Sequence, residues 1–283
     1  SKLFKNLHWD KIFVGFFYIS NKLNKTKMKK LLYLFSAIAL TLTSCSSDDD
    51  SNNSSGTLLT KIIETYDDGT VETIRFEYNG NKITRSYSDL DDRDETIYTY
   101  TGDLITKEEY FFDDGIDSFE EVIEYEYDSN NRLIKSIRTD EYGDIETDNF
   151  TYNSNGTVSF TTTANSTTIA SGIIYFNGNQ PYKKEITENP GTAFEVSWVE
   201  ESTFDLKVSP FANVTGFYKI IIGTPSYTRG YPGIAGNSLD FSIDNSLEES
   251  STYTYNGNNM PATDTYIDFN NSDYNSTSQY FYN

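Results

Sequence analysis

The side chains that could carry chemistry in this 283-residue chain are mostly carboxylates, because Asp and Glu number 43 against 22 Lys and Arg. The acids gather in runs between strand-like segments, and one run contains Asp89, Asp91, Asp92 and Asp94. Calcium prefers several carboxylate and carbonyl oxygens from a turning loop, so this run is a candidate calcium site. Its spacing is not that of an EF-hand, since Asp94 stands where that loop requires glycine. The alternative is a solvated acidic turn that keeps a sheet edge soluble.

Other chemistries are restricted by what the chain lacks. It has one histidine, His8, and one cysteine, Cys45. Serine and cysteine hydrolases need an imidazole base, and zinc, haem and iron–sulfur sites need His or Cys ligands. Neither of the common glycine-rich phosphate-binding patterns occurs. A formal charge of −21 disfavours nucleic acid as a partner. The functions that remain open are carboxylate chemistry, an oxygen-ligated metal such as calcium, or binding without chemistry.

The cysteine lies at the end of a targeting-like segment. Met28, Lys29 and Lys30 precede a mostly apolar run over 31–42, which is too short to cross a bilayer as a helix. The Leu-Thr-Ser-Cys sequence at 42–45 resembles the lipobox of bacterial lipoproteins. That resemblance implies a signal peptide over 28–44, cleavage between Ser44 and Cys45, and a diacylglycerol thioether on the sulfur. The alternative is an ordinary signal peptide with an incidental cysteine.

The segments on either side of the signal peptide have separate interpretations. Residues 1–27 are interpreted as an upstream extension from a misplaced start codon, or else as a genuine cytoplasmic extension. Residues 45–57 are rich in Ser, Asp and Asn, which predicts a flexible acidic tether. An acidic cluster after a lipidated cysteine resembles the export signal of Bacteroidota-type lipoproteins. It implies display on the outer face of the outer membrane, although a solvated linker has the same composition. Without residues 1–44 the chain has no histidine, and its acyl chains would provide the membrane attachment.

One pattern recurs from residue 58 onward. Two aromatic residues separated by one position precede a polar turn rich in Asn and Gly, and a short apolar strand follows. The second aromatic residue of each copy is Tyr78, Tyr100, Tyr127, Tyr152, Phe176 or Tyr255. A period of about 25 residues predicts a repeat architecture, and the long gap before the last copy predicts about three further units. Asn-Gly turns supply the positive φ angles of tight hairpins, so each unit is predicted to be a hairpin.

The strands of these hairpins alternate with period two, which predicts an antiparallel sheet with one buried and one wet face. The residues assigned to buried faces include Ile74, Phe76, Tyr78, Phe194, Val196 and Trp198. Arg75 and Glu77 lie on an opposite face, and charges at mid-strand argue against a barrel that crosses lipid. We therefore expect an all-β domain over 58–283, in which repeated antiparallel hairpins form one large curled or barrel-like sheet.

Two family resemblances support this fold. The Tyr-Asp-Ser-Asn-Asn-Arg-Leu segment at 127–133 resembles the YD (RHS-type) repeat, with Asn131 in place of its glycine. This likeness covers roughly residues 60–160. The whole chain is similar to uncharacterised Bacteroidota-type outer-membrane lipoproteins with degenerate repeats of this kind, some of which are described as having a porin-like β fold. That family has no assigned activity, so the resemblance implies none.

The repeats are interrupted between residues 211 and 236. Residues 217–223 form a continuous apolar run, which predicts a strand, and a Gly/Pro-rich loop follows it. Such a loop suits either a binding rim or the seam where the sheet closes. We favour the seam.

The leading hypothesis for function is a non-enzymatic surface lipoprotein with a binding or structural role, whose partner is a polysaccharide or another envelope protein. Some aromatic residues would then form a platform for sugar rings, although core packing is their commoner role. The first alternative is a carboxylate-dependent glycan hydrolase, which needs two carboxylates about 5–10 Å apart. The second is a pure structural scaffold. No cofactor is expected apart from calcium in the aspartate run.

Overall fold

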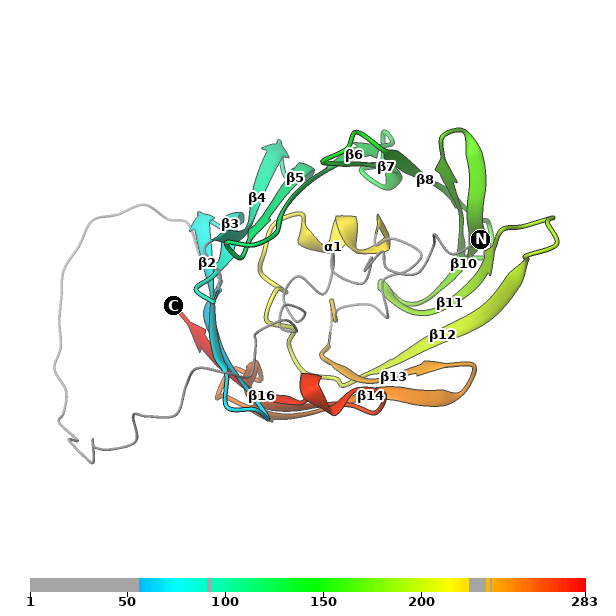
Figure 1. Cartoon of the computed structure of the whole chain (residues 1–283). Coiled ribbons are helices and arrows are strands. Elements are labelled where there is room, and N and C mark those ends of the chain that lie inside the picture. The colour runs from blue at the N-terminus through cyan, green and yellow to red at the C-terminus, as the bar shows by residue number, and fades with distance from the viewer. Residues whose placement is uncertain (1–55, 91–92, 224–232, 235) are drawn as a thin grey trace, which may run out of the picture.

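The computed structural model describes residues 56–90, 93–223, 233–234 and 236–283. Sixteen strands form a closed barrel in which every strand pairs antiparallel with its neighbours in sequence, and β1 pairs with β16 to close the wall. The predicted all-β fold of repeated hairpins is thereby confirmed (Figure 1). The first eight strands are β1 (Leu59–Tyr66), β2 (Val71–Asn79), β3 (Lys82–Ser88), β4 (Arg93–Thr101), β5 (Leu104–Asp113), β6 (Ser118–Tyr127), β7 (Leu133–Asp140) and β8 (Ile145–Tyr152). The other eight are β9 (Val158–Ala164), β10 (Thr167–Asn177), β11 (Gln180–Glu188), β12 (Val196–Phe204), β13 (Ser238–Ile243), β14 (Ser246–Tyr255), β15 (Pro261–Asp268) and β16 (Ser276–Tyr282).

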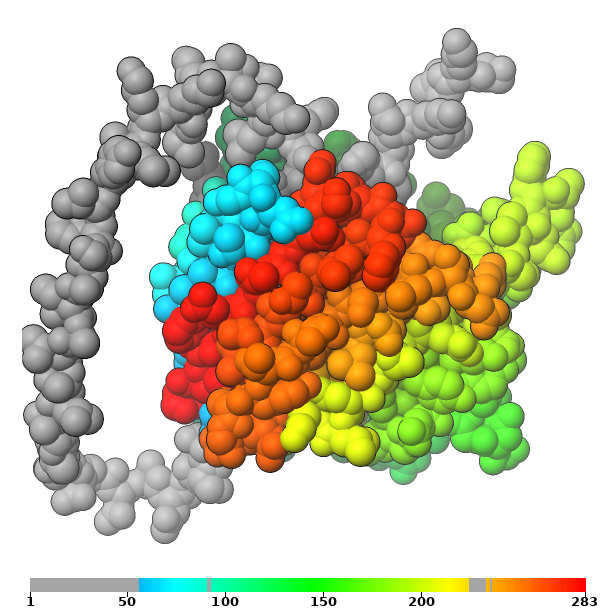
Figure 2. Space-filling model, turned by 90° about the horizontal axis from the view of Figure 1, so that it is seen from below, coloured from blue at the N-terminus to red at the C-terminus, as the bar shows by residue number. Residues whose placement is uncertain are grey.

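The barrel has two ends, which differ in their turns. We call the end where β1 begins and β16 finishes the base, and the opposite end the rim. The base carries the Asn/Gly turns predicted from the repeats, and Gly80, Gly102 and Gly178 have φ angles near +60° there. Figure 2 shows the molecule from the side, with the β11–β12 hairpin in yellow-green projecting from the body. A short 3-10 helix, η2 (Ser272–Tyr274), lies in the β15–β16 connection at the rim.

The repeated tyrosines line the inside of the base. The second aromatic residue of each repeat lies at the end of an even-numbered strand, and the hydroxyls of two of them reach the backbone of the preceding strand. Tyr78 donates to the carbonyl of Leu59 at 2.7 Å, and Tyr127 donates to that of Ile105 at 2.6 Å. These bonds satisfy a polar atom that would otherwise be buried against the apolar core. The repeat therefore fixes how neighbouring hairpins join.

The gap between the fifth and sixth aromatic copies has a different cause from the one expected. Phe204 ends β12 in the position of a repeat aromatic, and residues 205–237 are inserted before β13. The gap thus contains one repeat with a long insertion, and the prediction of about three further units is wrong. Asp205 holds the two ends of the insertion together, because its Oδ1 accepts from the backbone nitrogens of Lys207 and Asn237 at 2.9 and 2.8 Å.

The described part of the insertion enters the barrel. It forms a one-turn helix, α1 (Phe217–Ile220), followed by a 3-10 turn, η1 (Ile221–Gly223), and both lie within the ring of strands (Figure 1). Phe217 stacks on Phe211 with ring centroids 4.6 Å apart, and Phe211 contacts Phe76 of the wall edge-on. We call α1 and η1 together the plug. The apolar side chains of the plug are buried with those of the wall in one cluster.

The predicted strand over 217–223 is therefore wrong. A strand needs a neighbouring edge to bond with, and closure of the wall has already paired every edge. An enclosed segment satisfies its backbone locally instead, as a helical turn does. The seam hypothesis is wrong as well, since the sheet closes between β1 and β16.

Candidate functional site

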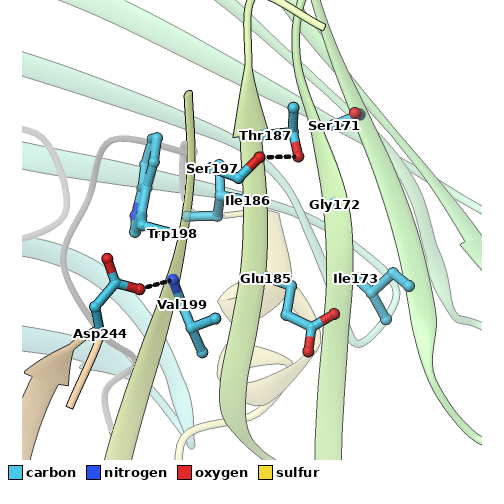
Figure 3. A pocket seen from close by; sticks show the side chains of 10 residues that line it. All are labelled: Ser171, Gly172, Ile173, Glu185, Ile186, Thr187, Ser197, Trp198, Val199 and Asp244. Atoms are coloured by element: carbon cyan, nitrogen blue, oxygen red, sulfur yellow. Dashed lines mark hydrogen bonds between the residues drawn. The ribbon is translucent and has the colours of Figure 1, made fainter. Parts of the chain in front are cut away.

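The wall has an external groove over β10, β11 and β12. Its volume is about 400 Å³. Its lining residues are Ser171, Gly172, Ile173, Glu185, Ile186, Thr187, Ser197, Trp198, Val199 and Asp244 (Figure 3). The strand register places them in rows, with Ser171, Thr187 and Ser197 side by side and Ile173, Glu185 and Val199 in the next outward-facing row. Period-two alternation directs these six side chains to the outer face.

Gly172 is needed where the groove crosses β10. A Cβ on this residue would lie 1.9 Å from the carbonyl oxygen of Glu185 and 2.6 Å from the ring of Phe160. Phe160 belongs to the buried core of the neighbouring strand. Glycine in a strand interior marks a close backbone approach or a bend, and here it lets the core ring pack directly against β10.

Two carboxylates give the groove its charge. Glu185 accepts hydrogen bonds from the hydroxyl of Tyr175 at 2.9 Å and forms an ion pair with Lys183 at 3.0 Å. The Lys183 ammonium, followed by the Tyr175 hydroxyl, lowers the pKa of Glu185. Asp244, in the β13–β14 turn, accepts from the backbone nitrogen of Val199 at 2.9 Å. The hydroxyls of Thr187 and Ser197 are bonded to each other at 2.9 Å, as Figure 3 shows.

A hydrophobic hairpin tip stands beside the groove. Phe194 is 80% exposed and Val196 is 57% exposed, so the prediction that both are buried is wrong; Val196 shares the strand face of Trp198 but lies at the end of the β11–β12 ladder. Residues 189–195 form the β11–β12 turn, and strand alternation begins only at Val196. Trp198, predicted to share their face, does pack against the core and donates to Glu200 at 3.0 Å.

The rim half of the barrel interior contains buried acids that the sequence reasoning missed. Those with side chains on the inner face include Glu64, Glu72, Asp94, Glu108, Glu121, Asp140, Asp148, Glu200, Asp264 and Asp268. Two buried bases, Arg138 and Lys184, lie among them. The sequence does contain a signal for these buried acids, because Glu72 and Glu121 lie on the same face of their strands as the core residues two positions later. Period-two alternation shows which side chains share one face of a strand, but it does not show that every side chain on that face is apolar.

Burial perturbs several of these acids. Desolvation raises the pKa of Glu64 and of Glu121 to about 8, and that of Glu108 to about 7. Neither carboxylate oxygen of Glu121 has a hydrogen-bond partner, although the Arg138 guanidinium lies 3.6 Å away. These carboxyls therefore hold protons at a pH where exposed acids have lost theirs.

The candidate calcium run is only partly described. Asp89 accepts from the backbone nitrogen of Thr73 at 2.7 Å, which fixes the β3–β4 turn to β2. Asp94 is buried and belongs to the inward face of β4. Asp91 and Asp92 lie outside the described residues, as do Ser44 and Cys45. Within the described ranges, no group of three or more acids is close enough to hold a metal ion. The calcium site stays a prediction.

Among the described residues there is no helix long and apolar enough to cross a membrane.

Comparison with known proteins gives a likeness of fold alone. No family model matches the chain, and no curated protein matches it. A crystal structure of a porin-like protein from Bacteroides uniformis superposes with a TM-score of 0.46 at 14% identity, covering 80% of this chain and 98% of that one. A porin-like protein from Bacteroides vulgatus gives a TM-score of 0.40 at 9% identity, covering 81% and 99%.

Proposed function

We propose that this protein is a lipid-anchored envelope protein whose barrel stands outside the bilayer and acts by binding. The observation that carries the proposal is the polarity of the wall. Arg75, Glu77, Glu124 and Glu126 are exposed at mid-strand on its outer face. A barrel that crosses a membrane needs an apolar outer band about 25 Å tall, and a basic residue at its midplane costs about 2–4 kcal/mol.

The interior supports a binding or structural role over passage of solutes. The plug fills the base half, where Phe217, Ile220 and Ile221 pack with the aliphatic side chains of the wall. Apolar residues line the inside of this wall and charged residues line the outside, which is the arrangement of a water-soluble domain. The interior therefore serves as a core at the base.

The anchor fits the orientation of the barrel. β1 begins at Leu59, so the proposed tether over 45–57 reaches the barrel at its base. With a lipid on Cys45, the rim and the β11–β12 hairpin would point away from the outer membrane, toward the cell exterior. The partner would be a polysaccharide or another envelope protein.

The groove chemistry favours binding over glycan hydrolysis. A general acid of a glycosidase needs a raised pKa, and the pKa of Glu185 is lowered. The carboxyls with raised pKa values, Glu64, Glu108 and Glu121, are buried inside the barrel instead.

The proposal is tested by the fate of Cys45 in native envelopes. Mass spectrometry of the purified protein should find an acylated Cys45 at the amino terminus, and external protease should digest the protein on whole cells. Cys45→Ala should move the protein from the membrane fraction to the soluble fraction. An unmodified Cys45, or a Cys45→Ala variant that stays in the membrane, would contradict the anchor. Stepwise conductance in a planar bilayer would contradict the non-spanning barrel.

A further inference from the structure

We infer that the groove over β10–β12, together with Phe194, is a binding site for a neutral polysaccharide chain. This inference rests on the proposed function, since it names the ligand class and the site of an envelope binding protein. Three independent features of the described residues support it: an exposed aromatic ring on a hydrogen-bonded turn, a lining of hydroxyls and acceptors, and a charge that selects against anions.

The aromatic feature is Phe194 at the tip of the projecting hairpin. Its backbone is held in place, because its nitrogen donates to Thr192 Oγ1 at 3.1 Å and Gly191 donates to Glu195 Oε2 at 2.6 Å. The ring is 80% exposed even though the turn around it is ordered by these bonds. A rigid aromatic face loses little conformational entropy on binding, and it matches the apolar face of a sugar ring.

The polar feature is the row of hydroxyls beside that tip. Ser171, Thr187 and Ser197 lie side by side across three strands, and each hydroxyl both donates and accepts. Glu185 adds a carboxylate acceptor on the central strand of the groove, and Asp244 adds one beside β12. Sugar hydroxyls are bound by such mixed sets of donors and acceptors, and charge-assisted bonds to carboxylates are the strong ones.

The lining also contains an apolar strip suited to the same ligand. Ile173 and Val199 flank Glu185 in the outward row, so they would face the C–H surface of a sugar whose hydroxyls reach the carboxylate. Binding sites for small ligands combine an apolar surface with a few placed polar groups, in volumes of about 300–1,000 Å³. The groove's volume, about 400 Å³, falls in this range and fits a short segment of a longer chain.

Charge decides which polysaccharides fit. Glu185 is ionised at neutral pH, where its lowered pKa keeps it, and the basic side chain of Lys183 beside it is already paired. Lys183 contacts both Glu185 at 3.0 Å and Glu201 at 4.0 Å. Lys183 offsets one carboxylate among Glu185, Glu201 and Asp244, so a uronate or a sulfated sugar would meet a net negative field, in a chain whose net charge is −21. Neutral sugars meet no such barrier.

The test uses the full-length protein in affinity electrophoresis and calorimetry. The probes are neutral polysaccharides (a linear β-glucan, a xylan, an α-mannan and a galactan) and anionic ones (alginate and polygalacturonate). We expect at least one neutral polysaccharide to retard and bind the protein, and both anionic ones to leave it unaffected. The inference would be overturned if the protein bound none of the neutral polysaccharides, or if it bound the anionic ones alone.

A matched pair of variants assigns the binding to this site. Tyr142 at the β7–β8 tip is 82% exposed, as Phe194 is at its own tip, but its hairpin contributes no residue to the groove, whereas the hairpin of Phe194 is formed by two strands that line it. Phe194→Ala should weaken binding about tenfold or more, as loss of an aromatic anchor does, while Tyr142→Ala should change it less than twofold. Equal effects of the two variants would overturn the inference. Circular dichroism checks that both are folded.

A second variant removes charge and leaves the aromatic ring in place. Glu185→Gln should weaken binding of the neutral polysaccharide and leave Phe194 exposed, so the two contributions can be separated. Failure here is distinguishable from failure of the proposed function. A protein with an acylated Cys45 that binds no neutral polysaccharide overturns this inference alone, and an unmodified Cys45 in a protein that binds one overturns the anchor alone.

Discussion

Glu121 and Arg138 face each other inside the barrel, with 3.6 Å between the carboxylate Oε1 and the guanidinium Nε, and their side chains are 0% and 6% exposed. The same guanidinium reaches Glu146 at 2.9 Å. Glu108, Glu146 and Asp140 all act on Glu121 as like charges. One base thus faces several acids in a largely buried region, and the stability of the wall depends on how many of those acids are ionised.

The first prediction concerns pH. Glu64, Glu108 and Glu121 have pKa values raised to between about 7 and 8 in the folded protein, against 4.5 for an unperturbed glutamate. The folded state therefore binds more protons than the unfolded state between about pH 4.5 and 8, and stability falls as the pH rises through that window. Each group contributes on the order of a few kcal/mol. Urea unfolding at intervals from pH 5 to 9 should show falling midpoints.

A double variant provides the control for the pH series. Glu64→Gln combined with Glu121→Gln removes two of the titrating groups with little change of shape, so its midpoint should fall less steeply with pH. A wild-type midpoint that is flat or rises from pH 5 to 8 would contradict the assignment.

The second prediction concerns the buried base. Arg138→Met leaves Glu146 and the ionised fraction of Glu121 without their shared counter-charge, which should lower the free energy of unfolding by about 3–5 kcal/mol. Arg132 provides the comparison, because its pair with Asp128 at 2.6 Å lies at the surface and its side chain is 45% exposed. Arg132→Met should cost about 0–1 kcal/mol. Equal losses in the two variants would show that burial of Arg138 has no energetic role.

The third prediction concerns the wall beneath the groove. Gly172→Ala places a methyl group against the Glu185 carbonyl and the Phe160 ring, so β10 must shift, at a cost of about 1–3 kcal/mol or more. Gly257→Ala is the matched control, since nothing lies within 4 Å of its Cβ and its φ is not in the left-handed region. Thermal melts should separate the two. Identical melts would mean that the close approach is readily relieved.

The fourth prediction concerns calcium at the β3–β4 turn. If Asp89 and its neighbours bind the ion, excess calcium should raise the melting temperature by several degrees over a sample with chelator. Asp89→Asn should reduce that rise. An unchanged melt in the wild type would remove the hypothesis and leave Asp89 as the residue that bonds the turn to Thr73.

The hairpins could be predicted because their information is local. Alternation through Ile74 and Phe76 and the turn at Gly80 specify one strand pair without reference to the rest of the chain. Closure of the barrel and the conformation of residues 217–223 depend on contacts with residues far away in sequence. A short apolar run such as Phe217–Gly223 has no periodicity that distinguishes a strand from an enclosed helical turn.

The candidate groove was harder to predict than the strands. Its lining combines three strands with Asp244 from another turn, and only the register shows which residues are neighbours. The sequence predicts Phe194 in the core because it stands two residues before Val196, in phase with the strand. The turn over 189–195 breaks that phase. Alternation holds only within a strand, and the boundary of β12 was not evident from its residue types.

The pairing of β1 with β16 has a consequence for how the molecule is made. Leu58 and Asn283 are bonded in both directions, with the nitrogen of each donating to the other residue, although 225 positions separate them. During synthesis the growing sheet keeps an unpaired edge strand on each side until β16 has emerged. The pairing of β1 with β16 becomes possible last, because β16 is the last strand to be made. We expect it also to form slowly, because joining segments so far apart in sequence carries a large loop-closure entropy. Joining Leu58 and Asn283 by a short linker and opening a different turn should yield a permuted barrel with the same wall.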